Sequence, residues 1–231
     1  MLYAGIIVFL LGGLFIFLGQ KKKKTQAEMS KTKSVPISQL QPNQQVEIQG
    51  TVVVGHPLQT PFSKRDCVYY EYKLERETQT KDSQGRSYLR WERVSENKNS
   101  MPFWLQDATG KVAVYPENAQ VEAQPLGELF VRQGDILQNQ FLKNAVNLLT
   151  GYNTRVSERA LFTNSPAYVF GYVTQGQQGL TIQKGQKGFI ISYKSEEEVE
   201  KGMARSSIIF KVLGILVIIG GVAMVIYSVV K

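Results

Sequence analysis

Cysteine and histidine are almost absent from this sequence. Its 231 residues contain one cysteine, Cys67, and one histidine, His56. A single thiol cannot form an intramolecular disulfide, and a lone cysteine is typical of a reducing compartment. These two residues also cannot supply the ligands that a cysteine- and histidine-based zinc site needs. We therefore expect no disulfide, no metal site and no bound cofactor.

Patterns typical of catalytic and phosphate-binding sites are also missing. There is no glycine-rich loop followed by a helix with a suitable lysine, and no serine-centred nucleophile elbow. Cys67 and His56 are the only residues that could form a nucleophile pair, and no third group that would orient them can be singled out. Asp66 disfavours a Cys67 thiolate. The other interpretation is a loop histidine and a packing cysteine, so we assign no catalytic residue and keep this pair only as candidates.

The net charge of +8 is concentrated outside the middle of the chain. Residues 35–194 hold 17 Lys and Arg against 14 Asp and Glu, a net of +3. A nucleic-acid-binding domain would carry clustered positive charge of its own. The remaining basic excess lies near the two ends, where contact with a membrane explains it. We therefore do not expect nucleic acid as a partner.

Two long apolar runs lie at the two ends of the chain. Residues 1–20 have no charged side chain, and residues 208–230 have one, Lys211, close enough to the start to reach the headgroups. Each run approaches the roughly 20 residues that cross a bilayer, and neither has the polar face of a buried core helix, which is the alternative. A cleaved signal peptide would carry its positive charge before the first run, not after it. We predict transmembrane helices over residues 1–20 and 207–230.

Basic residues flank both predicted spans on the side of the central domain. The residues expected at the membrane interface are Lys21, Lys22, Lys23, Lys24, Lys201, Arg205 and Lys211. Lysine and arginine concentrate in cytoplasmic segments, so the domain between the spans is predicted on the cytoplasmic side. The lipid bilayer is then one partner, and a membrane-associated protein is the other partner that we expect.

The residues between the spans have the pattern of a β domain. Stretches rich in β-branched and aromatic residues are separated by polar, glycine-containing turns, and no long amphipathic helices alternate with them. Strands are predicted over residues 45–54, 67–75, 88–92, 103–106, 111–115, 128–131, 167–173, 180–182 and 189–193, and order within 118–165 is left open. We expect a mainly β, antiparallel, barrel- or sandwich-like domain over residues 35–194, flanked by two transmembrane α-helices. A basic tether over 21–34 and a short juxtamembrane helix over 195–206 connect it to the spans.

Alternation predicts which strand residues face the core. In the strand over residues 67–75, the even positions form the core face, which puts Tyr69 on the opposite face. Trp104 lies opposite a core set in the same way. Exposed aromatic residues on a sheet can bind peptides, whereas packing against a second layer is the plainer interpretation.

Turn and cap chemistry predict three further details. Residues 77–86 are expected to form a hairpin loop. The segment from Asp107 to Gly110 matches a type I turn with a left-handed glycine. Ser195 and Glu198 form a capping box at a helix start, and Gly202 is expected to break or bend that helix.

A set of short motifs, in this order between two spans, resembles the GIDE or "beside a membrane" (BAM) domain. The residues that carry the resemblance are Cys67-Val68-Tyr69-Tyr70, Trp91, Pro102-Phe103 with Leu105, Asp107 with Gly110, Val112 with Val114, Pro116, Ser157-Glu158 and Tyr168-Val169-Phe170-Gly171. That domain lies between two transmembrane helices in mitochondrial ubiquitin and SUMO ligases and in related prokaryotic membrane proteins. The resemblance therefore implies a membrane-bound β domain with a link to ubiquitin-like conjugation.

The sequence departs from those ligases in two ways. They recruit their conjugating enzyme through a RING finger, whose zinc ligands are cysteines and histidines, and one residue of each type cannot form it. They also hold this domain in the intermembrane space, whereas the lysines here predict the cytoplasmic side. The leading hypothesis is thus a membrane-anchored binding or scaffold module without RING-type activity. The alternatives are an enzyme or conjugation accessory factor that uses Cys67 and His56, and an OB-like nucleic-acid-binding barrel.

Overall fold

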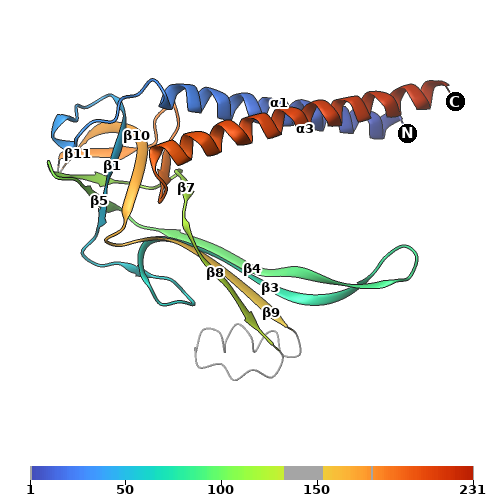
Figure 1. Ribbon diagram of the computed structural model, residues 1–231, viewed down its shortest axis with the longest axis horizontal. Helices are drawn as coiled ribbons and strands as arrows, with labels where there is room; N and C mark the ends of the chain where they lie inside the picture. Colours follow the sequence, from blue (N-terminus) through green and yellow to red (C-terminus); the bar gives the residue numbers. More distant parts are fainter. Residues whose placement is uncertain (1, 133–152, 178, 231) are drawn as a thin grey trace.

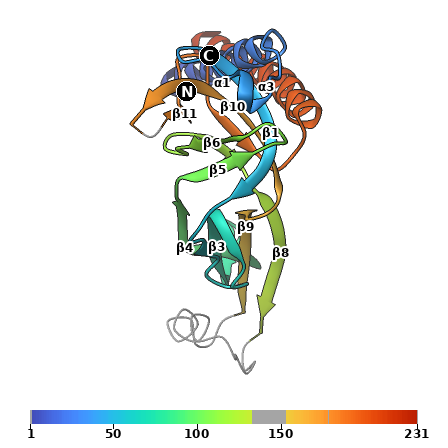
Figure 2. The ribbon, with the colours of Figure 1, turned by 90° about the vertical axis from the view of Figure 1, so that its left-hand side faces the viewer.

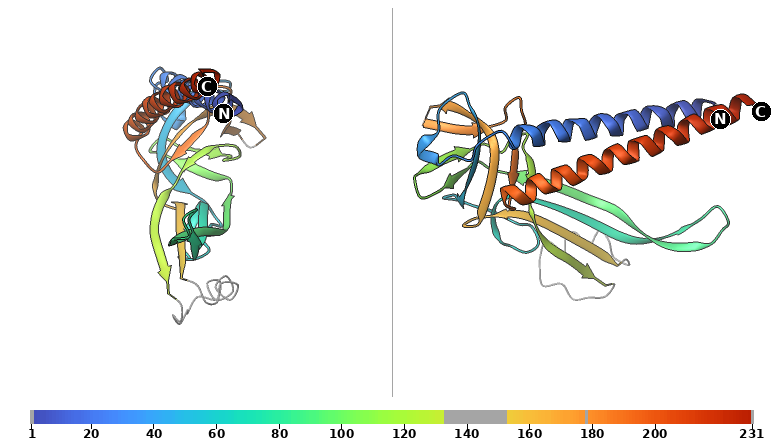
Figure 3. Two further views of the ribbon diagram at one scale, coloured as in Figure 1. Left: turned by 90° about the vertical axis from the view of Figure 1, so that its right-hand side faces the viewer. Right: turned by 45° about the horizontal axis from the view of Figure 1, so that its top comes forward.

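The protein is described here by a computed structural model that defines residues 2–132, 153–177 and 179–230 (Figure 1). A β domain lies at one end of the long axis, and two long helices extend from it. These are α1 (Leu2–Met29) and α3 (Glu196–Val230). The helices run antiparallel, so both chain termini lie at the far end, away from the β domain (Figures 1 and 3). Both helices are long and apolar enough to span a membrane.

Five strands close into a barrel. β1 pairs with β5 on one edge and with β10 on the other, and the chain of pairings β5-β6-β11-β10 completes the ring (Figure 2). The barrel strands are β1 (Gln45–Val53), β5 (Phe103–Gln106), β6 (Lys111–Val114), β10 (Pro166–Gly176) and β11 (Gly179–Gln183), and β12 (Ile190–Ser192) and β7 (Gln120–Glu122) continue the sheet beyond β10. A short 3-10 helix, η1 (Ile37–Gln39), precedes β1. All these pairings are antiparallel except β6 with β11 and β7 with β12.

A second sheet forms an open half-barrel beside the first. Its strands are β2 (Leu58–Gln59), β3 (Asp66–Lys81), β4 (Ser87–Ser100), β8 (Gln124–Val131) and β9 (Thr154–Phe162). The long strand β3 is central, with β2 and β4 on one edge and β9 on the other, and β9 also pairs with β8. The prediction of a mainly β domain flanked by two apolar helices is confirmed, and the barrel alternative within it is the correct one.

The barrel interior is apolar, as the alternating strands require. Ile48, Leu105, Val169 and Ile182 are fully buried in it. Gly171 is required by packing, because a Cβ atom there would lie 2.5 Å from Ile182 Cγ2.

The hairpin of β3 and β4 is longer than predicted. Residues 77–81 and 87–92 continue the two strands, and only the turn around Asp82 to Arg86 is left of the expected loop. This turn is polar and is closed by the Asp82 carboxylate, which accepts hydrogen bonds from the amides of Gln84 and Arg86. Residues 77–92 are mostly polar, so the sequence alone does not predict that they pair as strands.

One of the face assignments made from the sequence needs correction. Tyr69 is 8% exposed and belongs to the barrel core, because a register shift between Cys67 and Tyr69 changes the alternation of β3. Trp104 lies on the face of β5 opposite the buried Phe103 and Leu105, as predicted, and is half-buried, with Lys111 Nζ 5.0 Å from its ring centre. Gly110 is also absent from the residues with positive φ, so the left-handed glycine predicted in that turn is wrong.

The helices differ from the prediction mainly in their extent. α1 continues through the lysines to Met29, so most of the predicted tether is helical. α3 runs from Glu196 without interruption, and Gly202 does not break it. The capping box is confirmed, since Ser195 Oγ accepts from the Glu198 amide and Glu198 accepts from the Ser195 amide.

An apolar cluster joins the helices to the barrel. Met29 from α1 and Val199 and Met203 from α3 pack against Tyr168 and Phe170 on the outer face of β10. Because Met29 is fully buried there, the ends of both helices are fixed to the same strand. The domain therefore cannot turn freely on its helices.

Candidate functional site

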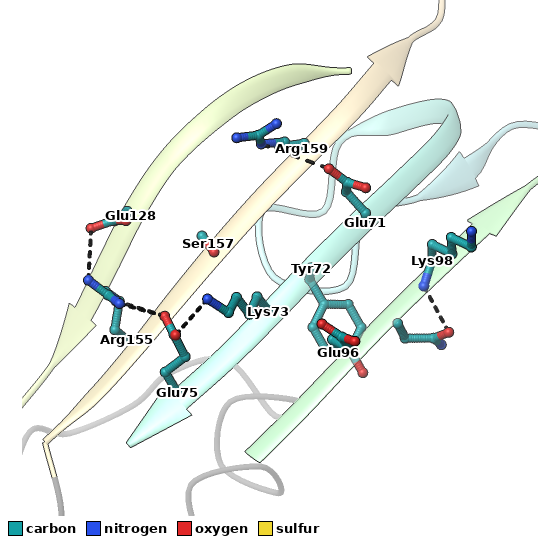
Figure 4. A pocket seen from close by; sticks show the side chains of 11 residues that line it. Glu71, Tyr72, Lys73, Glu75, Glu96, Lys98, Glu128, Arg155, Ser157 and Arg159 are labelled. Carbon is teal, nitrogen blue, oxygen red and sulfur yellow. Dashed lines mark hydrogen bonds and ion pairs between the residues drawn. The ribbon is translucent and has the colours of Figure 1, made fainter. Parts of the chain in front are cut away.

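A charged trough of about 730 Å3 lies on one face of the half-barrel (Figure 4). Its lining comes from β3, β4, β8 and β9. The charged side chains around it are Glu71, Lys73, Glu75, Glu96, Lys98, Glu128, Arg155 and Arg159. Four are acidic and four are basic, so the trough has no net sign although its surface is densely charged.

Strand alternation places these charges on one face. Residues 71, 73 and 75 of β3 and residues 155, 157 and 159 of β9 are every second residue, and such residues share a face. The register then sets opposite charges side by side, with Glu75 beside Arg155 and Glu71 beside Arg159. On the other edge of β3, Glu71 lies beside Lys98. Opposite charges directly across strands stabilise a sheet, so the trough lining is part of the fold.

The end of the trough around Glu75 holds a buried ion-pair network. The Glu75 carboxylate, whose side chain is 8% exposed, lies 2.6 Å from Lys73 Nζ and 2.7 Å from an Arg155 guanidinium nitrogen. Burial alone would raise the pKa of Glu75, but the hydrogen bonds and charges of Lys73 and Arg155 outweigh it and lower that pKa. Arg155 also stacks over Trp91, 4.7 Å from the ring centre. The ion pair at the other end is weaker, since the Arg159 side chain is 60% exposed and its Nε lies 3.8 Å from a Glu71 carboxylate oxygen.

Replacing Arg155 with leucine should destabilise the half-barrel. Glu75 would keep Lys73 alone as a partner, and removing one member of a buried charged pair leaves a desolvated charge that costs about 3 kcal/mol. The lowered pKa of Glu75 means that its stabilising contribution is present above the ordinary carboxyl pKa and is lost as the pH falls. The Arg155→Leu variant should therefore have a lower melting temperature at neutral pH and a flatter dependence of that temperature on pH in the acid range.

The matched control is Arg159→Leu, which removes an exposed arginine from the same face of the same strand. Its weak pair with Glu71 is worth little, as exposed ion pairs usually are. Thermal unfolding of both variants across the acid range compares them. An equal loss of stability in the two variants would contradict the buried network.

The candidate nucleophile pair is not assembled as a site. Cys67 is fully buried among Leu58, Ala160 and Phe162, whereas His56 is exposed on the preceding loop. Burial, followed by the charges of Glu158 and Asp66, raises the pKa of the Cys67 thiol to about 11. Such a thiol packs well but is a poor nucleophile at neutral pH. Within residues 2–132, 153–177 and 179–230, no group of His, Cys, Asp and Glu is arranged to hold a metal ion.

The residues that carried the family resemblance are mostly structural. Phe103 and Val114 are buried in the barrel core, Pro116 is buried, and Pro102 is exposed beside them. Asp107 ties the start of the domain to the β5–β6 turn, because its carboxylate accepts from the Ile37 amide at 2.8 Å and from the Gly110 amide at 3.0 Å.

Glu158 also has a structural role. The residue is 5% exposed, and its carboxylate accepts hydrogen bonds from the amides of Phe62, at 2.8 Å, and Ser63, at 2.9 Å. It thereby fixes the loop between β2 and β3. A glutamate on a strand with two buried amides is a backbone anchor, which sequence alone does not distinguish from a surface residue.

Some of the basic residues expected at the membrane interface lie close together on the helix pair, around Lys22 of α1 and Lys211 of α3. Lys22 Nζ donates to Ser206 Oγ at 3.3 Å and lies 5.0 Å from the Phe210 ring centre. The Lys211 side chain packs near Gly19, and Lys201 pairs with Glu197. Both helices therefore change from apolar to polar near Lys22 and Lys211, whereas Lys201 lies ten residues, about 15 Å, away from Lys211 along α3.

The trough itself was missed in the sequence. The signal was the alternation of charge in Glu71, Lys73 and Glu75 and in Arg155, Ser157 and Arg159. β9 lies in the region whose order was left open, so its pairing with β3 could not be foreseen. Without that register, each charge has the appearance of an ordinary surface residue.

The fold and the trough together define a class of protein, a β domain of barrel and half-barrel carried on two helices that are long and apolar enough to span a membrane. The family model for GIDE, described as E3 ubiquitin ligase, matches residues 71–226. The match covers more than half of the chain, so the chain belongs to the GIDE family.

Other comparisons add little. No curated protein matches the chain. A similar solved structure is the second OB-fold domain of replication protein A from Methanococcus maripaludis, with 16% identity, a TM-score of 0.24 and coverage of 71% of this chain and 91% of that one. A TM-score this low carries no argument about fold or function.

Proposed function

We propose that this chain is a membrane-anchored binding module that holds an extended, charged segment of a membrane-associated protein in its trough. The observation that carries the proposal is the lining of opposite charges in register across β3, β4 and β9. A lining of balanced sign suits a peptide with charges of both signs better than a phosphate or a nucleic acid, which would need clustered positive charge. The trough lining contains neither cysteine nor histidine.

Attachment at both ends supports a partner in or near the same bilayer. The domain joins a helix at each end, and the cluster around Met29 fixes both helices to β10. The trough is thereby kept within a short reach of the membrane. The basic residues near the domain end of the helix pair, such as Lys22 and Lys211, favour the cytoplasmic side for the domain.

A photoreactive residue in place of Ser157, in the middle of the trough, tests this proposal in the full chain in its own membranes. We expect a discrete adduct with a membrane protein, and we expect Arg159→Glu with Lys98→Glu to abolish it, because these two exposed cations offer the trough's most accessible positive charge. The same photoreactive residue in place of exposed Glu117, outside the trough, is the control. Adducts that are the same at both positions, or that survive the charge reversals, would argue against the proposal.

The second candidate function is a part in ubiquitin-like conjugation, because the family is described as E3 ubiquitin ligase. These 231 residues cannot form a RING finger, so RING-type activity is not proposed for them. A role as an accessory factor that uses Cys67 and His56 chemically remains to be tested. If cells that carry the Cys67→Ser variant and cells that carry the His56→Ala variant both keep the native phenotype, neither residue has a chemical role in conjugation.

A further inference from the structure

Glu47 is a buried carboxyl group that lies outside the trough. It is on the outer face of β1, beside Phe170 of β10, and it is fully buried. Its chain neighbours Val46 and Ile48 belong to the barrel core instead. Neither of its carboxylate oxygens makes a hydrogen bond of good geometry. A polar group buried in this way is costly, so the surroundings of Glu47 need an explanation.

The start of α3 covers Glu47. This helix begins beside β10 (Figure 1), where its Val199 packs against Phe170, the residue next to Glu47 across the strands. Glu196, in the first turn of α3, accepts a hydrogen bond of 3.3 Å from the Gln49 side chain of β1. The first two turns of α3 are therefore part of what keeps water away from Glu47.

The charges that act on Glu47 have its own sign. Burial, followed by the charge of Glu196, raises the pKa of Glu47 to about 8, and the charge of Glu200 acts in the same direction. A hydrogen-bond contribution from Tyr168 of β10 lowers that pKa, but by less. Burial raises the pKa of Tyr168 itself, so its hydroxyl stays neutral. From α1, the neutral Ser30 donates to the Glu200 carboxylate at 2.8 Å.

The cations nearest in the chain are engaged elsewhere or face solvent. On the α1 side, Lys187 pairs with Glu28 at 2.8 Å. Lys33 precedes Ser34, whose backbone bridges to Glu47, but the Lys33 side chain is exposed. The group that keeps Glu47 neutral in this position is therefore its own proton.

The start of α3 lies between two fixed points. Before it, Lys194 pairs with Glu122, and the Lys194 amide donates to Ser192 Oγ at 3.0 Å. Beyond it, Ser207 Oγ donates to a backbone carbonyl of α1 at 2.9 Å. Gly202 lies between these points and is a weak helix former. The first two turns of α3 can therefore bend away from the barrel at Gly202 while both fixed points stay in place.

We propose that Glu47 is a proton-operated latch for the first two turns of α3. With its proton, Glu47 stays buried and these turns stay packed on β10. Loss of the proton would leave a carboxylate buried beside Glu196 without water, so the turns lift and admit water to it. Because these turns join the β domain to the helix pair, the domain then turns more freely on its helices. The latch depends on neither the trough nor its partner.

Distances between spin labels test the latch in the full chain in vesicles. Glu117→Cys on the barrel and Lys201→Cys on α3, both at exposed positions, carry the labels in a Cys67→Ala background. We expect a narrow distance distribution at about pH 6 and a longer, broader one at about pH 9.5, with the change centred near pH 8. Glu47→Gln should keep the narrow distribution at both pH values, because glutamine stays neutral.

Two controls separate movement of α3 from other effects of pH. Labels at Glu117→Cys and Thr51→Cys, both on the barrel, should keep their distance at both pH values, which shows that the barrel stays folded. Glu92→Gln, at an exposed glutamate of β4, should respond as the native chain does. The latch is overturned if the native α3 distance is the same at both pH values, or if it changes equally in Glu47→Gln. A melting temperature that falls with rising pH while this distance stays constant would also overturn it.

Discussion

Replacing Gly12 with valine should force α1 and α3 apart, whereas the same change at the neighbouring Gly13 should leave the helix pair intact. A Cβ atom at Gly12 would lie 2.6 Å from Ile218 Cγ1 and 2.8 Å from Gly214 O. The second contact is backbone, so only separation of the helices relieves it. A Cβ atom at Gly13 would point into open space and would meet no atom of α3 within 4 Å. Overpacking of this kind costs about 1–3 kcal/mol, and here it acts along a whole helix contact.

The reason is a seam of small residues at every seventh position. Gly5, Gly12 and Gly19 of α1 face Gly221, Gly214 and Ser207 of α3 in antiparallel order. Small residues let helix backbones approach closely in a membrane, where packing replaces the hydrophobic effect as the main attraction. Ser207 Oγ adds a buried hydrogen bond of 2.9 Å to Gly19 O. A bulky side chain in the middle of the seam therefore affects the whole pair.

The measurement is the distance between spin labels on the exposed positions Leu14→Cys and Leu216→Cys, in a Cys67→Ala background, with the full chain in vesicles. We expect the distance to lengthen and its distribution to broaden for Gly12→Val but not for Gly13→Val. A second matched pair checks the other helix, because a Cβ atom at Gly221 would lie 2.8 Å from the Phe9 amide nitrogen and Gly220 has open space. If each seam glycine behaves like its neighbour, the seam does not hold the helices together.

Replacing Glu47 with glutamine should stabilise the protein strongly at neutral and alkaline pH. Glu47 lies on β1 beside Phe170 and is fully buried. Neither carboxylate oxygen makes a hydrogen bond of good geometry, although the Tyr168 hydroxyl and the Glu196 carboxylate lie close enough to act on its pKa. Burial, together with the charges of Glu196 and Glu200, raises the pKa of Glu47 to about 8. At neutral pH the folded protein therefore keeps this carboxyl group protonated, next to the start of α3.

The sign of the pH effect follows from this raised pKa. Compared with an unfolded glutamate of pKa 4.5, the folded state binds the proton more tightly. The contribution of protonated Glu47 to the free energy of unfolding is complete below about pH 4.5, declines as the pH rises, and is lost above about pH 8. Glutamine stays neutral and has nearly the shape of the protonated acid. The advantage of Glu47→Gln should thus grow from near zero to on the order of 4 kcal/mol across this range.

Thermal unfolding of the full chain from about pH 4.5 to pH 8 tests this window. The native chain should lose melting temperature as the pH rises, and Glu47→Gln should remove most of that slope. Glu117→Gln, at an exposed glutamate, is the matched control and should follow the native curve. Parallel curves for the native chain and Glu47→Gln would show that Glu47 is not the group that titrates.

The parts of the fold that sequence predicts are those with a strong local pattern. The two apolar runs and the β5–β6 hairpin are examples, because length, turn residues and alternation act within a few positions. The face of Tyr69 was predicted wrongly, since one shifted residue in β3 reverses the alternation. The sequence does not predict the helical extension to Met29, because the contacts that stabilise it come from the barrel and from α3.

The trough depends on information that no local pattern carries. Its charges become a site only when β9 pairs with β3 in one register, and the two strands are far apart in sequence. The same is true of Glu47, whose burial follows from the way α3 folds back over β1 and β10. The glycine seam has a visible seven-residue spacing in each helix, yet its meaning appears only when the helices are aligned.

The side of the membrane on which the β domain lies also determines which partners can reach the trough. If both helices cross the bilayer, the chain ends near Tyr3 and Tyr227 should lie on one face of it, and the β domain, with exposed Glu117, on the other. The trough would then be available only to cytoplasmic segments of membrane proteins. The glycine seam and the cluster around Met29 would keep that orientation fixed.

Labelling from the two sides of the membrane tests this arrangement most directly. In a Cys67→Ala background, Glu117→Cys on the β domain, Tyr3→Cys and Tyr227→Cys are each exposed to a membrane-impermeant maleimide in sealed vesicles of either orientation. We predict that Glu117→Cys is labelled only when the cytoplasmic face is outside, and that Tyr3→Cys and Tyr227→Cys are labelled only in the opposite orientation. Labelling of all three positions from one face, or of Glu117→Cys from the non-cytoplasmic face, would contradict a cytoplasmic domain held between two membrane spans.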